Sequence, residues 1–219
     1  MEKPGKEFYQ ITTIDGKRKP NSTDYYSVTV LTMIIMYSSI TGLSSIRKEK
    51  NLKTGNRILC SPVKKHEILI GKVMGCIVVT VIQALTVLLF SKLVLNAYWG
   101  TNIGAIMGII VSEAVMTVSL GTCIGFITKN EGLSVGIINV VIPVIVMLGG
   151  GYVPVDVMGE FFRKLSVISP VKWANQAIFN VIYNSDLSYV PVSIAINLMV
   201  AALLITVSSI AYKKEGVQN

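Results

Sequence analysis

Glu113 is the residue whose type and position most strongly suggest chemistry, because it lies in an otherwise apolar stretch, 103–127. An ionised carboxylate at the centre of a membrane span costs about 2.5–3.5 kcal/mol on insertion scales. We therefore expect Glu113 to face a bundle interior, to carry a proton or to line an aqueous route. Two interpretations stay open. In the first, Glu113 takes part in the movement of a substrate or a proton. In the second, Glu113 has no such role, and its side chain either bonds to a serine or threonine of a neighbouring helix or lies nearer the membrane surface.

Asn139 and Pro143 lie in a second apolar stretch, 133–148. A polar residue and a proline in one span are compatible with an unwound segment beside a translocation route. An ordinary proline kink is the favoured interpretation, since proline is tolerated in membrane helices. Asn139 and Glu113 are the candidates for such a route.

Motifs of common enzyme sites are absent from the sequence. No GxxxxGK[ST] phosphate-binding loop occurs, and Gly71-Lys72 is followed by Val73. His66 is the single histidine, so a zinc-protease HExxH site is excluded, and no GxSxG nucleophile motif is present. The three cysteines form no CxxC pair and are expected to be small buried hydrophobic residues: Cys60, Cys76 and Cys123. We expect no catalytic residue, no metal site and no cofactor bound by this chain.

The composition excludes most water-soluble folds. Of 219 residues, 52% are hydrophobic and only 15% are charged, and the mean hydropathy is +0.61, whereas soluble domains carry about 25% charged residues. A net charge of +8 would suggest nucleic acid in a soluble protein. Here the basic residues lie between apolar blocks, so membrane topology explains them and no nucleic-acid partner is expected.

The apolar blocks predict an all-α bundle in the lipid bilayer, because a bilayer core of about 30 Å needs roughly 20 helical residues. The predicted membrane domain, 25–214, follows a polar extracellular lead-in, 1–24, and precedes a cytoplasmic tail, 215–219. About five transmembrane helices are expected, and they cover residues 25–46, 73–95, 103–127, 133–148 and 190–212.

The stretch 152–184 is too amphipathic to span and predicts a re-entrant or interfacial helical hairpin. Its first half has apolar residues at helical spacing, with Glu160, Arg163 and Lys164 opposite: Met158, Phe161, Phe162, Leu165 and Ile168. Ser169 is expected to cap a second helix in which Pro170 is the first-turn proline. The apolar stripe of that second helix is Ala174, Ala177, Ile178, Val181 and Ile182.

The distribution of Lys and Arg sets the expected orientation. The loop 47–72 carries eight basic residues and two acidic ones, which predicts a cytoplasmic location for it and for the C-terminus. The basic residues Lys17, Arg18 and Lys19 conflict with an outside lead-in. We interpret this conflict as a sign of a further span upstream or of a partner that supplies it.

Two motifs in consistent order resemble the ABC type-2 transporter permease family. EKNLKTGNRILCSPV with EILIGK is similar to the stretch after the second span of these permeases, and GGGYVPVDV…LSVISPVKWANQAI is similar to the stretch before their last span. The resemblance covers about residues 20–214. Compared with the family pattern, the chain is expected to begin near the end of the extracellular domain, without the first span, and it has Thr54-Gly55 where many relatives have Gly-Thr.

This resemblance implies a non-enzymatic permease subunit of an ATP-driven exporter in the cell membrane. Its implied partners are a separate ABC ATP-binding subunit, which uses the ATP, and a second permease copy. The loop positions implied to couple to that subunit are Glu49, Thr54, Arg57, Ser61 and Pro62, within a pattern that also includes Gly71 and Lys72. The positions implied to belong to the re-entrant hairpin are Gly150, Pro154, Pro170 and Trp173. Two alternatives remain: a proton-coupled secondary transporter using Glu113, and an inactive truncated permease fragment or scaffold. The substrate is not identified.

Overall fold

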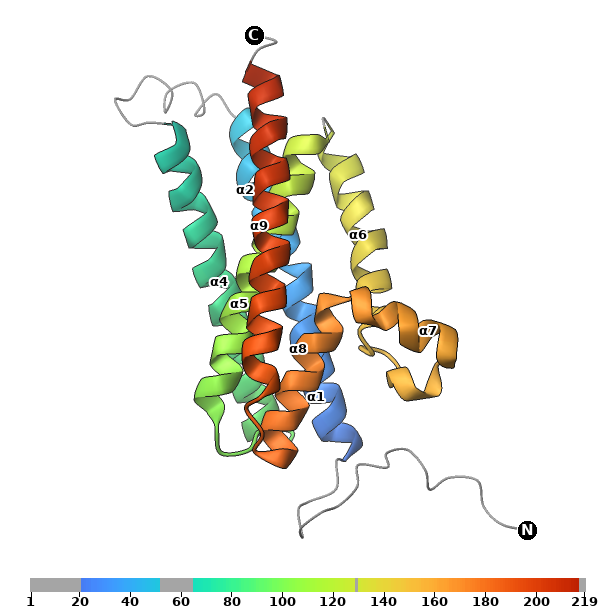
Figure 1. Ribbon diagram of the computed structural model, residues 1–219. Coiled ribbons are helices and arrows are strands. Elements are labelled where there is room, and N and C mark those ends of the chain that lie inside the picture. Colours follow the sequence, from blue (N-terminus) through green and yellow to red (C-terminus); the bar gives the residue numbers. More distant parts are fainter. Residues whose placement is uncertain (1–20, 52–64, 129, 217–219) are drawn as a thin grey trace, which may run out of the picture.

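The computed structural model describes residues 21–51, 65–128 and 130–216, which form a bundle of long helices with one shorter helical excursion (Figure 1). The long helices are α1 (Ser22–Tyr37), α2 (Ser39–Asn51), α4 (Lys65–Leu93), α5 (Ile103–Ile127), α6 (Glu131–Leu148) and α9 (Tyr189–Gly216). The excursion contains η1 (Val155–Val157), α7 (Glu160–Leu165), η2 (Ser166–Ile168), α8 (Pro170–Phe179) and η3 (Asn180–Asn184). The described residues include no strand, and the expected all-α fold is confirmed.

Five helical segments of the described chain are long and apolar enough to cross a membrane. They are Ser22–Arg47, Ile70–Leu93, Ile103–Ile127, Glu131–Leu148 and Tyr189–Ser209. The fourth is two residues longer at its start than the predicted block, because Asn130 caps it: the Asn130 side chain accepts a hydrogen bond of 2.9 Å from the amide of Gly132. The first segment consists of α1 and α2, which meet at Ser38.

The central element is α5, which contacts α1, α2, α4, α6, α8 and α9. Its contact with α2 brings the two backbones together. A Cβ atom on Gly121 would lie 1.9 Å from the carbonyl oxygen of Ser39, and one on Gly42 would lie 2.8 Å from that of Val118. Such small-residue contacts are a common way for membrane helices to associate closely. The α2–α5 pair therefore forms a closely packed unit.

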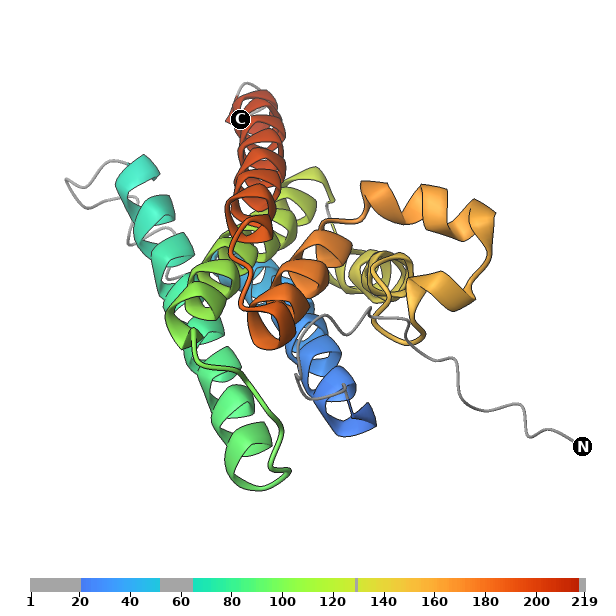
Figure 2. The same ribbon diagram turned by 60° about the horizontal axis from the view of Figure 1, so that its bottom comes forward.

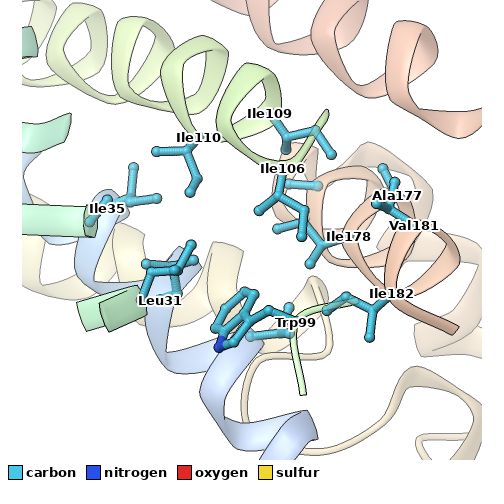
Figure 3. Packing of buried hydrophobic residues seen from close by; sticks show 14 of the residues in the cluster. Leu31, Ile35, Trp99, Ile106, Ile109, Ile110, Ala177, Ile178, Val181 and Ile182 are labelled. Carbon is cyan, nitrogen blue, oxygen red and sulfur yellow. The ribbon is translucent and has the colours of Figure 1, made fainter. Parts of the chain in front are cut away.

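Two apolar clusters fill the bundle. The first joins α1, α4, α5, α8 and the turn before α5, with Trp99 packed beneath Ile106 and Ile178 (Figure 3). The second joins the α1–α2 segment to α5, α6, α8 and α9 through the buried residues Met36, Leu43, Met116, Ile138, Ile142, Val146, Val171 and Ala201. Because α1, α5 and α8 contribute to both clusters, these three helices form the core of the molecule.

The bundle has two distinct ends. At one, which we call the hairpin end, lie the start of α1, the turn 94–102 and the end of α8 (Figures 1 and 2). At the other, which we call the loop end, lie the end of α2, the start of α4, the α5–α6 turn and the end of α9 (Figure 1). The segments that flank the basic loop therefore lie at the same end of the bundle as the end of α9.

Candidate functional site

Glu113 lies near the middle of α5, about 15 Å along the helix axis from Ile103 at 1.5 Å per residue. Its side chain is 0% exposed. Neither carboxylate oxygen has a hydrogen-bond partner in the part of the chain that the structure describes. No described serine or threonine therefore satisfies this carboxylate, which leaves an unusual polar group in the bundle interior.

The surroundings of Glu113 on α5 are mostly apolar. Residues three and four positions away share its helix face. Ile109 and Ile110 belong to the first apolar cluster and Met116 to the second. The remaining neighbour, Thr117, donates a hydrogen bond to the sulfur of Met36 over 3.5 Å. Glu113 therefore lies between the two clusters.

A second buried polar group joins α5 to α9. The Asn197 amide nitrogen donates to the Ser112 hydroxyl over 3.1 Å, and that hydroxyl donates to the carbonyl of Ile109 over 2.8 Å. Ser193 lies one turn from Asn197 on α9, and both side chains are fully buried. The Asn197 side-chain oxygen and the Ser193 hydroxyl have no partner among the described residues. In the sequence, the only sign of this polar group is Asn197, a single asparagine in an apolar span.

The structure does not bring Asn139 to Glu113. Asn139 is exposed on α6, whose buried face is formed by residues such as Ile138 and Ile142. Pro143 lies within α6, which continues through it to Leu148. The unwound span considered for this stretch is therefore absent from the structure.

The hairpin region begins with a tight connection to the end of α6. Gly150 has φ +76°, a conformation that favours glycine, and its carbonyl accepts a hydrogen bond from the Tyr25 hydroxyl of α1. Pro154 precedes η1. Pro170 is the first residue of α8, as the sequence predicts. Trp173 donates from its indole nitrogen to the Val167 carbonyl over 3.0 Å.

The Ser169 side chain at the start of α8 makes a different hydrogen bond from the expected capping bond. Ser169 occupies the N-cap position but makes no side-chain capping bond. Its hydroxyl instead donates to the carbonyl of Ile145 over 2.8 Å and so ties the hairpin to α6. Asn175 adds a second tie, since its amide nitrogen donates to the Gly149 carbonyl over 3.1 Å. Contacts to a different helix thus replace the local cap.

The two halves of the hairpin differ in burial. The predicted apolar stripe of α8 and η3 is buried against the bundle: Ala174, Ala177, Ile178, Val181 and Ile182. The first half contains no buried side chain in α7, and Phe161 is 73% exposed and Ile168 77%. Gly159, at φ +84°, separates η1 from α7. The first half is therefore a broken helix that projects from the bundle (Figure 2).

A polar cluster at the hairpin end was not predicted from the sequence. Asp24, assigned there to the polar lead-in, is 4% exposed at the start of α1. Its carboxylate accepts hydrogen bonds of 2.9 Å from the Tyr98 amide and from the Tyr183 hydroxyl. The neighbouring Tyr25 ring stacks on Phe179 at 5.5 Å between centroids. One carboxylate thus joins α1 to the turn before α5 and to η3.

The implied coupling positions lie mostly outside the described residues. These are Thr54, Arg57, Ser61 and Pro62, while Glu49 lies in the described helix α2 with its side chain outside the description. The flanks of the loop are described, and both are helical: α2 reaches Asn51 and α4 begins at Lys65.

These flanks are fastened to the bundle at the loop end. Arg47 is buried and donates from its guanidinium to the Thr128 hydroxyl over 3.5 Å, and Thr128 in turn contacts the Ser134 hydroxyl. Lys72 donates to the Ser45 carbonyl over 3.3 Å. Both ends of the basic loop are therefore joined to neighbouring helices.

An apolar five-span bundle with a helical hairpin and basic loop flanks defines a multi-pass helical membrane protein. Among the described residues, no group of three or more His, Cys, Asp or Glu could hold a metal ion. The chain belongs to the ABC-2 transporter family, since the model described as "ABC-2 family transporter protein" matches residues 5–211. This confirms the family to which the two sequence motifs pointed.

Curated relatives include two bacterial permeases. The chain is 26% identical over 183 residues to the "Probable multidrug ABC transporter permease YbhR" of Escherichia coli strain K12, covering 75% of this chain and 49% of that protein. It is 22% identical over 152 residues to the "Linearmycin resistance permease protein LnrN" of Bacillus subtilis strain 168, covering 69% and 39% respectively. The chain therefore spans less than half the length of either relative. No solved structure matches it.

Proposed function

We propose that this protein is the membrane subunit of an ATP-driven ABC exporter, in which a separate ATP-binding subunit hydrolyses ATP. The observation that carries the proposal is the family match over residues 5–211, in a sequence without a phosphate-binding loop of its own. The subunit acts in the cell membrane together with a second permease copy, and its C-terminus is cytoplasmic. The names of the relatives favour drug-like compounds as substrates.

The loop 47–72 receives the movement of the ATP-binding subunit in this proposal. Its described flanks support the role, because helix continues beyond the α2 and α4 spans and Arg47 and Lys72 join them to neighbouring segments. The close packing of α2 on α5, at Gly42 against Val118 and at Gly121 against Ser39, would then pass a displacement of α2 to α5. ATP binding shifts the bundle between two arrangements only if the loop contact differs in free energy between them.

Transport in inverted membrane vesicles tests the proposal. Vesicles that contain this protein and its ATP-binding subunit are expected to accumulate a fluorescent drug when ATP is added. The accumulation is expected to continue when the pH gradient across the vesicle membrane is collapsed. Vesicles with a partner whose phosphate-binding lysine is replaced are the control and are expected to be inactive. Equal accumulation with and without ATP would contradict an ATP-driven exporter.

A proton-coupled secondary transporter is the second candidate, favoured by the buried and unpartnered carboxylate of Glu113. In that case a pH gradient alone would drive accumulation, and Glu113→Gln would abolish it. An inactive fragment is the third outcome, indicated by the absence of both flux and a copurifying ATPase. The vesicles therefore separate the first two candidates, and purification of the protein with its bound partners identifies the third.

A further inference from the structure

We propose that Glu113 binds the cationic group of transported compounds, and that its carboxyl carries a proton when no such compound is bound. The inference rests on the proposed transport function and adds to it a class of substrate, namely organic cations with an apolar body. It starts from the position of this side chain, which is unlike that of any other charged residue in the described spans.

Glu113 is the single acidic or basic residue in the interior of the described candidate spans. The others within the spans lie within two residues of a span end, and α8 carries its basic residue near its start: Asp24, Arg47, Lys72, Lys92, Glu131 and Lys172. The span Tyr189–Ser209 of α9 contains no acidic or basic residue. The candidate spans that pack on α5 therefore present no charge at the depth of Glu113, and the Lys172 ammonium of α8 lies over the Trp173 ring, 5.7 Å from its centroid.

The charge state of Glu113 follows from this burial. The side chain is 0% exposed, and neither oxygen meets a described hydrogen-bond donor. An ionised carboxylate without a counter-charge is strongly disfavoured in an apolar interior. The closed packing therefore favours the neutral acid, and only a cation brought to the site would favour the carboxylate.

The exchange balances in charge and atoms. A cation that reaches the neutral acid forms a carboxylate–cation pair, and the O–H proton passes to water. Ile109, Ile110 and Met116 flank the site, and Thr117 is the single hydroxyl on the same face. This face of α5 offers one hydroxyl, whereas a metal cation needs several oxygen ligands. It suits a lipophilic organic cation, whose apolar body packs against the isoleucines and the methionine.

Access to Glu113 requires the core helices to separate. The Thr117 hydroxyl of α5 bonds to the Met36 sulfur of α1 over 3.5 Å, while the Thr32 hydroxyl of α1 donates to the Asn175 side chain of α8 over 3.0 Å. The second bond keeps α1 and α8 together, so their separation from α5 breaks the Thr117 contact and the apolar packing of the two clusters. An opening of α1 and α8 from α5 is the kind of rearrangement that alternating access demands.

Binding of tetraphenylphosphonium to the purified protein in lipid nanodiscs tests this inference without ATP. We expect the affinity to rise with pH and about one proton to be released per bound cation, since binding needs the ionised carboxylate. In Glu113→Gln, the affinity should fall by about tenfold or more and the proton release should vanish. Glu113→Asp should retain both, and Glu131→Gln at a span end should match the unmodified protein.

Tetraphenylborate, of the same shape and opposite charge, is the matched ligand control. Its binding should be unaffected by Glu113→Gln. An affinity for tetraphenylphosphonium that is independent of pH would overturn the inference, and this measurement needs no variant. Equal losses of both probes in Glu113→Gln would indicate a structural role and would also overturn it. If the ATP-driven transport fails while these binding results hold, the proposed function is wrong and the cation site stands.

Discussion

Asp24 shows how one carboxylate holds distant segments together. It receives hydrogen bonds from Tyr98 and Tyr183, which are 74 and 159 residues away in the sequence. Hydrogen bonds to charged groups contribute about 1.5–3 kcal/mol each. The position of α8 and η3 against α1 therefore depends on this side chain as well as on apolar packing.

We predict that Asp24→Ala lowers the free energy of unfolding by about 3–6 kcal/mol and that Tyr183→Phe lowers it by about 1.5–3 kcal/mol. The larger effect follows because Asp24 accepts both bonds whereas Tyr183 donates one of them. Thermal unfolding in detergent measures the difference. Asp186→Ala is the control, since this residue lies in the short connection before α9 and its carboxylate bonds Ser188 locally. Equal melting temperatures for Asp24→Ala and Asp186→Ala would contradict the cluster.

The sequence identifies Glu113 more readily than Asp24. A carboxylate inside an apolar stretch of 25 residues is conspicuous from composition alone. Asp24 stands at the border of a polar segment, and its partners come from two other elements, so no local pattern indicates its burial. Asn197 is an intermediate case, because a polar residue in the apolar helix α9 is visible in the sequence, while its hydrogen bond to Ser112 of α5 is not.

At the scale of elements, the contact between α2 and α5 depends on glycine. A Cβ atom at Gly121 would overlap the Ser39 carbonyl and lie 3.0 Å from the Leu43 nitrogen. Backbone atoms cannot yield as a flexible side chain can. Any larger residue must therefore move one helix away from the other.

We predict that Gly121→Ala destabilises the protein by about 1–3 kcal/mol or more through overpacking. Gly136→Ala in α6 is the matched control: a Cβ atom there meets nothing within 4 Å, and alanine is favoured over glycine inside a helix by about 1 kcal/mol. Chemical unfolding of both variants measures the effect. A Gly121→Ala protein as stable as Gly136→Ala would show that α2 and α5 are not packed this closely.

Helices formed by long continuous apolar stretches could be predicted well, whereas the shorter amphipathic segments between them could not. The expected span 103–127 coincides with α5. The first half of the hairpin was expected to be one helix, and Gly159 interrupts it with a positive φ. Ser169 was expected to cap α8, but the Ile145 carbonyl lies within its reach and takes its hydroxyl. At Ser169 a tertiary contact overrode the local preference, whereas at Gly159 the glycine's own positive φ interrupts the helix.

For the whole molecule, the two ends of the bundle should face opposite sides of the membrane. Thr101 lies in the turn at the hairpin end and Gly132 follows the α5–α6 turn at the loop end, and both are exposed. In a protein with Cys60 replaced, we predict that Thr101→Cys reacts with a membrane-impermeant maleimide in intact cells and that Gly132→Cys reacts only after permeabilisation. The buried Cys76 and Cys123 remain in this protein, and their slow reaction with the maleimide gives the background labelling. The reverse pattern would place the basic loop outside the cell and contradict the account.

The coupling of transport to ATP hydrolysis through the basic loop is the central claim. Its most direct test is Arg57→Glu, measured in vesicles for ATP hydrolysis and for drug accumulation at the same time. We predict that hydrolysis by the partner subunit continues while ATP-dependent accumulation falls by about tenfold or more, with the protein still in the membrane. Arg163→Glu, an exposed charge reversal on the hairpin, is expected to leave both rates unchanged. Accumulation that survives Arg57→Glu intact would contradict the claim.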